Sequence, residues 1–137
     1  MTHALFHSTT ARMLLAVAAG LTMLLAGAAS AQVTYTEQQA TQGATAFSAN
    51  CATCHGDKAQ GAEAPPLTGG QFDGIWRGGP VKDLLTFIAE NMPADKPGSL
   101  RKDVYLVVTA FIMSINKIPA GATALPADPP ATMLIPK

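Results

Sequence analysis

Charge of either sign is scarce in this sequence. Only 13% of its 137 residues are charged, and nine basic side chains balance nine acidic ones, so the net formal charge is zero. A nucleic-acid-binding domain usually carries a concentrated excess of lysine and arginine. The balanced charge therefore excludes that class of partner, and it also argues against strong long-range attraction of a charged protein.

A hydrophobic run long enough to span a membrane is also missing. The main apolar stretch extends from Met13 to about Ala28, whereas a transmembrane helix needs about 20 apolar residues. The basic residue Arg12 precedes this stretch, and the small residues A-S-A follow it at 29–31. This order is typical of a secretory signal peptide, here residues 1–31, that is cleaved at its end. We expect export to the periplasm and no stable membrane insertion after cleavage; the alternative is an uncleaved membrane anchor.

Removal of the signal peptide would leave one small domain and a proline-rich tail. Taking 31 residues from 137 leaves 106, which is enough for one modest hydrophobic core, and the net formal charge becomes −1 because Arg12 is lost. We expect a folded domain at 32–117 and a tail at 118–137. The tail contains five prolines and cannot be helical throughout. It could lie against the domain, be disordered, or provide a docking strip for a partner.

The mature sequence lacks the strict alternation of polar and apolar residues that marks a half-buried strand, and helical spacing dominates instead. Thr36 and Gln39 have the spacing of a capping box, which predicts a first helix that runs towards Cys51. A second amphipathic segment occupies residues 81–91. The third and strongest occupies residues 99–116, with Ser99 as its expected N-cap. The predicted fold class is therefore all-α, a small helical bundle with long loops.

The only two cysteines, Cys51 and Cys54, stand three apart, and His55 follows directly. In an exported protein this pair could form a short disulfide or a redox-active thiol pair. Zinc is disfavoured, because it usually needs four ligands and His55 is the only histidine outside the predicted signal peptide. The pattern C-x-x-C-H is also the attachment motif for c-type haem. At a helix start, both sulfurs can reach the two vinyl groups on one porphyrin edge, so haem attachment is the interpretation that we favour.

Four segments, in this order, resemble the small class I c-type cytochromes, which are monohaem electron carriers. They are G-x-x-x-F-x-x-x-C-x-x-C-H-G at 43–56, APPLTG at 64–69, NMPADKPGSL at 91–100, and a last helix that ends in VVTAFIMSI. The resemblance spans about residues 38–116. The third segment and the helix after it are similar to bacterial cytochromes that serve periplasmic dehydrogenases. The resemblance implies a cytochrome c-like helical bundle around one haem that both cysteines attach covalently.

The same resemblance assigns roles on the proximal side of the haem. His55 would be the proximal iron ligand, and its other ring nitrogen should donate a hydrogen bond, as ligating histidines usually do. The carbonyl of Pro65 is the expected acceptor, with Pro66 as the spare candidate because the proline is doubled. Leu67 would pack on the face of the haem.

On the distal side the expected iron ligand is Met92. Only Met113 and Met133 compete with it outside the predicted signal peptide. Met113 lies within the last predicted helix, where a methionine is usually core filler, and Met133 lies in the tail. Met92 follows a helix and precedes Pro93, in a loop that can bend its sulfur toward the iron. A second histidine ligand is excluded within the mature chain.

Other residues receive packing or secondary roles from the resemblance. Gly43 and Phe47 are similar to the contact point between the first and last helices of the family, and Phe111 to the aromatic residue that crosses there. Trp76 could donate a hydrogen bond to a haem propionate or fill the core. Arg77 could pair with a propionate, although a solvated arginine is the simpler expectation.

Histidine–methionine ligation would leave the iron without an open site, which favours one-electron transfer over catalysis. We therefore expect an electron carrier and not an enzyme. It would accept electrons from a periplasmic dehydrogenase and pass them toward a terminal oxidase, as a monomer or as the small subunit of a dehydrogenase complex. Two alternatives remain, a haem enzyme or gas sensor with an open distal site, and a thiol–disulfide protein. Partners are expected at the haem edge, which five cations could surround: Lys58, Lys82, Lys96, Arg101 and Lys102.

Overall fold

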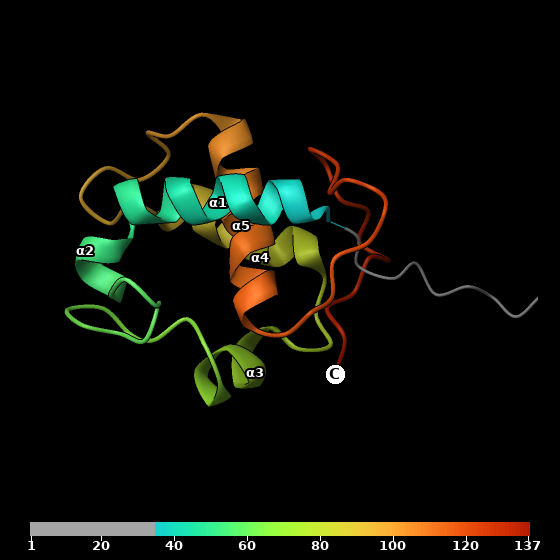
Figure 1. Cartoon of the computed structure of the whole chain (residues 1–137), viewed down its shortest axis with the longest axis horizontal. Coiled ribbons are helices and arrows are strands. Elements are labelled where there is room, and N and C mark those ends of the chain that lie inside the picture. Colours follow the sequence, from blue (N-terminus) through green and yellow to red (C-terminus); the bar gives the residue numbers. More distant parts are fainter. Residues whose placement is uncertain (1–34) are drawn as a thin grey trace, which may run out of the picture.

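The computed structural model describes residues 35–137, and the predicted signal peptide at 1–31 lies outside this range. Over the described residues the chain forms five α-helices and no β-strand (Figure 1). The helices are α1 (Glu37–Asn50), α2 (Ala52–His55), α3 (Gly70–Trp76), α4 (Val81–Asn91) and α5 (Lys102–Ile115). The all-α prediction is confirmed. Between residues 35 and 137 no helix is long and apolar enough to cross a membrane.

Helix α1 begins at the predicted capping box. The backbone N–H of Gln39 donates to Oγ1 of Thr36 at 3.2 Å, and the N–H of Thr36 donates to Oε1 of Gln39 at 3.1 Å. These two bonds satisfy amide groups that a helix start otherwise leaves without partners. The same Gln39 side chain also bonds both backbone groups of Leu125, so the start of α1 holds part of the C-terminal tail.

The crossing of α1 and α5 is the most extensive contact between helices (Figure 1). At this crossing a Cβ atom on Gly43 would stand only 1.9 Å from the carbonyl oxygen of Val107, so no larger residue fits. Next to it the rings of Phe47 and Phe111 pack with their centroids 5.1 Å apart. The predicted close crossing is confirmed, and glycine is the residue that permits it.

Helix α5 begins later than the sequence pattern indicates. Its N-cap is Arg101, which has no side-chain capping bond, so the prediction that Ser99 caps the helix is wrong. The reason is local. The N–H of Ser99 donates to the carbonyl of Lys96 at 3.2 Å, which commits Ser99 to a turn before the helix. A serine can stabilise such a turn as readily as a helix start.

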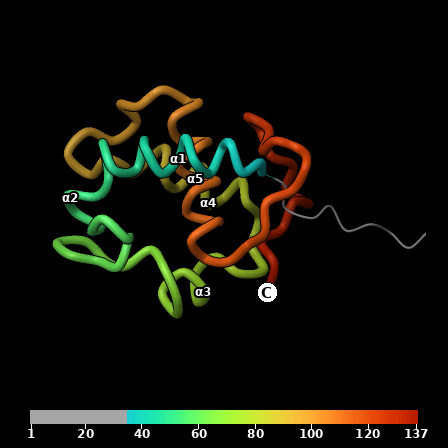
Figure 2. Tube along the Cα trace, viewed as in Figure 1, coloured from blue at the N-terminus to red at the C-terminus, as the bar shows by residue number. Residues whose placement is uncertain are grey.

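The tail at 118–137 packs on the helical body, which is the first of the three possibilities considered for it. Leu125, Met133 and Ile135 are buried in the same core as the helices. The tail runs beside the segment before α4, where Ile135 donates to the carbonyl of Gly79 and accepts from the N–H of Gly78, both at 2.8 Å. Figure 2 shows this segment passing from the start of α1 to the region between α3 and α4.

Arg77 fastens the end of the tail to the body. Its guanidinium group donates to the carbonyl oxygen of Pro136 at 3.0 Å and to that of Asn116 at 2.8 Å, and it pairs with Asp73. The expectation that Arg77 is simply solvated is therefore wrong, and its pairing with a propionate stays a prediction. The side chain is a structural link between the tail, α3 and the end of α5.

Candidate functional site

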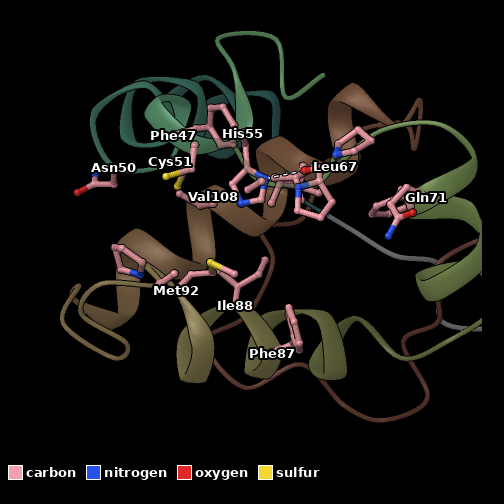
Figure 3. A pocket seen from close by; sticks show the side chains of 18 of the residues that line it. Phe47, Asn50, Cys51, His55, Leu67, Gln71, Phe87, Ile88, Met92 and Val108 are labelled. Atoms are coloured by element: carbon pink, nitrogen blue, oxygen red, sulfur yellow. Dashed lines mark hydrogen bonds between the residues drawn. The ribbon is translucent and has the colours of Figure 1, made fainter. Parts of the chain in front are cut away.

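A cavity of about 720 Å³ lies between the helices and contains the predicted site residues (Figure 3). Its walls come from α1 to α5, from the loop before α3 and from the start of the loop after α4. Most of the lining side chains are apolar, and the volume is within the range of about 300–1,000 Å³ that is usual for bound cofactors and other small molecules. A cavity of this kind suits a large, mainly apolar group.

The two cysteines lie at one rim of this cavity. Helix α2 starts directly after Cys51, and its first backbone bond runs from the N–H of His55 to the carbonyl of Cys51 at 3.0 Å. One short helical turn therefore brings the half-buried Cys51, the exposed Cys54 and the His55 ring to a single edge. Burial, with a smaller effect from the nearby Cys54, raises the pKa of the Cys51 thiol to about 11. Burial at this position therefore disfavours a thiolate.

His55 is held in one orientation. Its side chain is only 7% exposed, and Nδ1 lies 2.8 Å from the carbonyl oxygen of Pro65. A carbonyl can only accept, so Nδ1 carries the proton and Nε2 keeps its lone pair, the form that a metal ligand requires. The hydrogen bond expected at Pro65 is present, and Pro66 is not its acceptor. Figure 3 shows the His55 ring directed into the cavity.

Met92 reaches the cavity from the opposite side to His55 (Figure 3). It follows α4 directly, and its N–H donates to the carbonyl of Ile88 at 2.9 Å, so the end of the helix sets its position. Among residues 35–137 the other two methionines, Met113 and Met133, are buried in the core, and neither lines the cavity. Met92 is thus the one methionine sulfur in this range that faces the same space as the His55 imidazole.

Leu67 and Trp76 both line the cavity and are both half-buried. Leu67 follows the two prolines, as expected for a residue that packs against a bound group on the His55 side. The ring of Trp76 packs against the ring of Phe87, with their centroids 5.4 Å apart. Trp76 therefore stands in the cavity wall and not in the centre of the helical core, where its indole N–H could still serve a polar substituent.

The charged side chains in the cavity wall are not the five cations that the sequence suggests near the haem edge. The carboxylates in the cavity wall belong to Glu63 and Asp95. None of the five cations named above lines the cavity, and two of them, Lys82 and Arg101, form ion pairs elsewhere. Lys58 and Lys96 are exposed. The five cations therefore lie outside the cavity wall, and their place around the haem edge stays a prediction.

Two residues that support the site were not found from the sequence. Asn116 donates from Nδ2 to the carbonyl of Leu67 at 2.8 Å and accepts the N–H of Gly69 on Oδ1 at 3.2 Å. Asn116 thus joins the end of α5 to the loop on the His55 side of the cavity. Tyr105 contacts the backbone of Met92 on the other side. The sequence pattern places both residues only within a helical segment, and no spacing rule links them to backbone groups so distant in the chain.

The donor groups present fit a c-type haem. The apolar walls suit a porphyrin, two thiols stand at one rim, and an imidazole with a free Nε2 and a thioether sulfur enter from opposite sides. In the part of the chain that the structure describes, no three or more His, Cys, Asp and Glu residues are grouped to hold a metal ion by themselves. The described residues therefore offer no four-ligand zinc site.

No curated protein and no solved structure matches the chain. A family model does match, over residues 38–112, and it is described as cytochrome c oxidase, cbb3-type, subunit III. That range is more than half of the chain and includes every residue of the cavity wall discussed above. The chain therefore belongs to this family of class I c-type cytochromes, and it is a haem-based electron carrier with a covalently attached c-type haem.

Proposed function

We propose that this protein is a periplasmic one-electron carrier whose haem iron is ligated by His55 and Met92 and whose haem is attached through Cys51 and Cys54. The observation that carries the proposal is the shared cavity. An imidazole with its proton fixed on Nδ1 and a methionine sulfur enter it from opposite sides, with both thiols at one rim. When bound, the haem supplies a single-electron couple at its iron.

The protein residues determine what that couple is used for. If His55 and Met92 both held the iron, no position would remain for oxygen, and the site would suit electron transfer and not oxygen activation. A methionine ligand also raises the reduction potential relative to more strongly donating ligand pairs. The apolar lining, to which Leu67 and Phe72 contribute, excludes water from the iron and limits the solvent rearrangement that accompanies a change of charge.

The thiol–disulfide alternative is weakened by the cysteine that is less exposed. Redox-active C-x-x-C motifs carry a thiolate whose pKa is lowered, in known cases to about 3.5–7.5. In this chain burial raises the pKa of the Cys51 thiol to about 11. The environment of Cys51 therefore disfavours the thiolate that thiol exchange requires.

The proposed location and partners are supported by different observations. Export is supported by the sequence at 1–31, with Arg12, an apolar run and small residues at its end. An oxidase as electron acceptor is in line with the family description, which names an oxidase subunit. A periplasmic dehydrogenase as donor is supported by the likeness of residues 91–100 to cytochromes that serve such enzymes. The protein would work as a free monomer or as the small subunit of that enzyme.

The test is the exported protein itself. Its intact mass should equal the chain from Gln32 plus one haem, and the haem should survive acid-acetone extraction. The oxidised form should show the absorbance band near the red edge that a methionine sulfur–iron(III) bond produces, and the reduced form should bind carbon monoxide poorly. A mass without haem would overturn the proposal. A haem protein that lacks the band and binds carbon monoxide readily would support the haem enzyme or gas sensor instead.

A further inference from the structure

The loop between α4 and α5, residues 92–101, carries the proposed distal ligand, and the side chains of Met92 and Leu100 at its ends pack against the core. Its middle section, residues 94–99, is exposed. Within the loop the backbone bonds are short-range, from Lys96 to the carbonyl of Pro93 at 2.9 Å and from Ser99 to the carbonyl of Lys96 at 3.2 Å. These bonds shape the loop, but they do not attach it to the body of the protein.

One side chain joins both ends of this loop to the body. The hydroxyl of Tyr105 donates to the carbonyl oxygen of Met92 at 2.8 Å and accepts the N–H of Leu100 at 3.1 Å. A phenol has one proton to donate and lone pairs to accept with, so both capacities are used here. Tyr105 is only 4% exposed, which means that water does not readily replace either bond.

The support behind Tyr105 is rigid. It lies in the first turns of α5, the helix that is fixed against α1 by the close approach of Gly43 to Val107. Met92, in contrast, has a flexible side chain whose sulfur can be held in place only if its backbone is held first. A ligand residue on a loop needs contacts that hold its backbone, because its bond to the metal alone does not define its position.

We propose that Tyr105 is the positioning residue for the distal ligand, and that it keeps the sulfur of Met92 at the iron by closing the ligand loop at both ends. This inference rests on the proposed function, since it needs Met92 to be a ligand. Tyr105 would act through Met92 and not through an atom of its own at the iron. Loss of the hydroxyl should leave the haem attached and the fold intact, while Met92 leaves the iron more often.

The experiment compares three variants of the haem-containing protein. Tyr105→Phe removes the hydroxyl at the loop. Tyr35→Phe is the matched control, since Tyr35 is equally buried and its hydroxyl donates to the carbonyl of Ile118, a contact with the tail. Met92→Ala shows the full effect of losing the ligand. For each variant the methionine–iron(III) band and the rate of carbon monoxide binding to the reduced protein are measured.

We expect Tyr105→Phe to weaken the band and to raise the carbon monoxide rate by on the order of tenfold, a change that the loss of two buried hydrogen bonds can produce. Tyr35→Phe should keep the wild-type values even if it lowers the melting temperature. If Tyr105→Phe behaves as wild type while Met92→Ala loses the band, the positioning role is wrong but Met92 ligation stands. If the wild type has no band and Met92→Ala changes nothing, the proposed function itself fails.

A measurement on the wild-type protein covers the case in which Tyr105→Phe yields no haem-containing product. Imidazole added to the oxidised protein should displace Met92 and loosen the loop. The amide of Leu100 should then exchange its hydrogen faster. The amide of Gly69, which donates to the side chain of Asn116 on the His55 side, should not change. Unchanged exchange at Leu100 in the imidazole-bound protein would overturn the proposal. Coupling is reciprocal, so this result would mean that the bonds of the Tyr105 hydroxyl contribute nothing to Met92 ligation.

Discussion

Nδ1 of His55 donates to the carbonyl oxygen of Pro65, 2.8 Å away, and this bond fixes the direction of the imidazole. Pro65 is itself part of a loop that has little regular structure. The loop is held by Asn116, whose side chain bonds the carbonyl of Leu67 and the N–H of Gly69. The orientation of the proposed proximal ligand therefore depends on a residue at the far end of α5.

Replacement of Asn116 by alanine should consequently destabilise the protein. The change would remove the two partly buried bonds to the backbone of Leu67 and Gly69, and a typical intramolecular hydrogen bond contributes about 0.5–1.5 kcal/mol. Denaturant unfolding of the haem-containing protein measures this free energy. Asn91→Ala is the matched control, because Asn91 is exposed and its side chain bonds only the carbonyl of Phe87 on its own helix. Equal losses in both variants would contradict the role given to Asn116.

Replacement of Met92 by histidine should lower the reduction potential and keep the iron six-coordinate. Imidazole is a stronger donor than a thioether, so it stabilises the oxidised iron, and axial ligands as a class tune haem potentials over ~0.8 V. Redox titration measures the shift. Met113→Leu is the control, since Met113 is fully buried in the core and does not line the cavity. A potential that changes in the control but not in Met92→His would show that another residue is the distal ligand.

Replacement of Gly43 by alanine should strongly destabilise the helix crossing. The new Cβ would stand 1.9 Å from the carbonyl oxygen of Val107 and 2.7 Å from Cβ of Phe111, and backbone cannot yield as a flexible side chain can. Overpacking of this kind costs about 1–3 kcal/mol, and more where backbone must move. Thermal unfolding measures the effect. Gly74→Ala in α3 is the control, because nothing lies within 4 Å of its added Cβ and alanine favours a helix by about 1 kcal/mol. A Gly43→Ala protein as stable as wild type would mean that the two helices can separate without cost.

How far the sequence predicted the fold depended on the range of the interaction concerned. The capping box of Thr36 and Gln39 and the helix at 81–91 were predicted correctly, because their signals lie within a few residues. Helix α3 was missed, since seven residues with two glycines show no clear period. Ser99 was assigned to a cap because a serine before an apolar helix fits one, whereas its backbone is used in the turn with Lys96.

For the site residues too, short-range signals were predicted from the sequence and long-range contacts were not. The motif at 51–55 identified one rim of the cavity, and the family resemblance implied Met92, which lines the opposite side. The contacts of Tyr105 and Asn116, and those of Arg77 to the tail and the end of α5, could not be predicted, because each is made to a backbone group. Any residue type can present a carbonyl or an N–H, so such a partner leaves no mark in the sequence.

The rate at which a small anionic oxidant takes electrons should report which charges stand near the exit from the haem. Lys96 is exposed in the loop that follows Met92, while Lys137 ends the tail on the opposite side of the molecule in Figure 1. With hexacyanoferrate(III) as the oxidant at low ionic strength, Lys96→Glu should slow oxidation several-fold, because it replaces attraction with repulsion near the exit. Lys137→Glu should have less effect, because the Coulomb interaction weakens with distance from the exit.

Two further measurements test whether the slower oxidation of Lys96→Glu arises from the charge near the exit. The reduction potential of Lys96→Glu should stay close to that of wild type, so that a slower rate cannot be attributed to a smaller driving force. Added salt should bring the rates of Lys96→Glu and wild type together, as screening requires. If Lys137→Glu were the slower variant and Lys96→Glu were silent, electrons would leave near the proline-rich tail, and the docking face would have to be placed there instead of beside Met92.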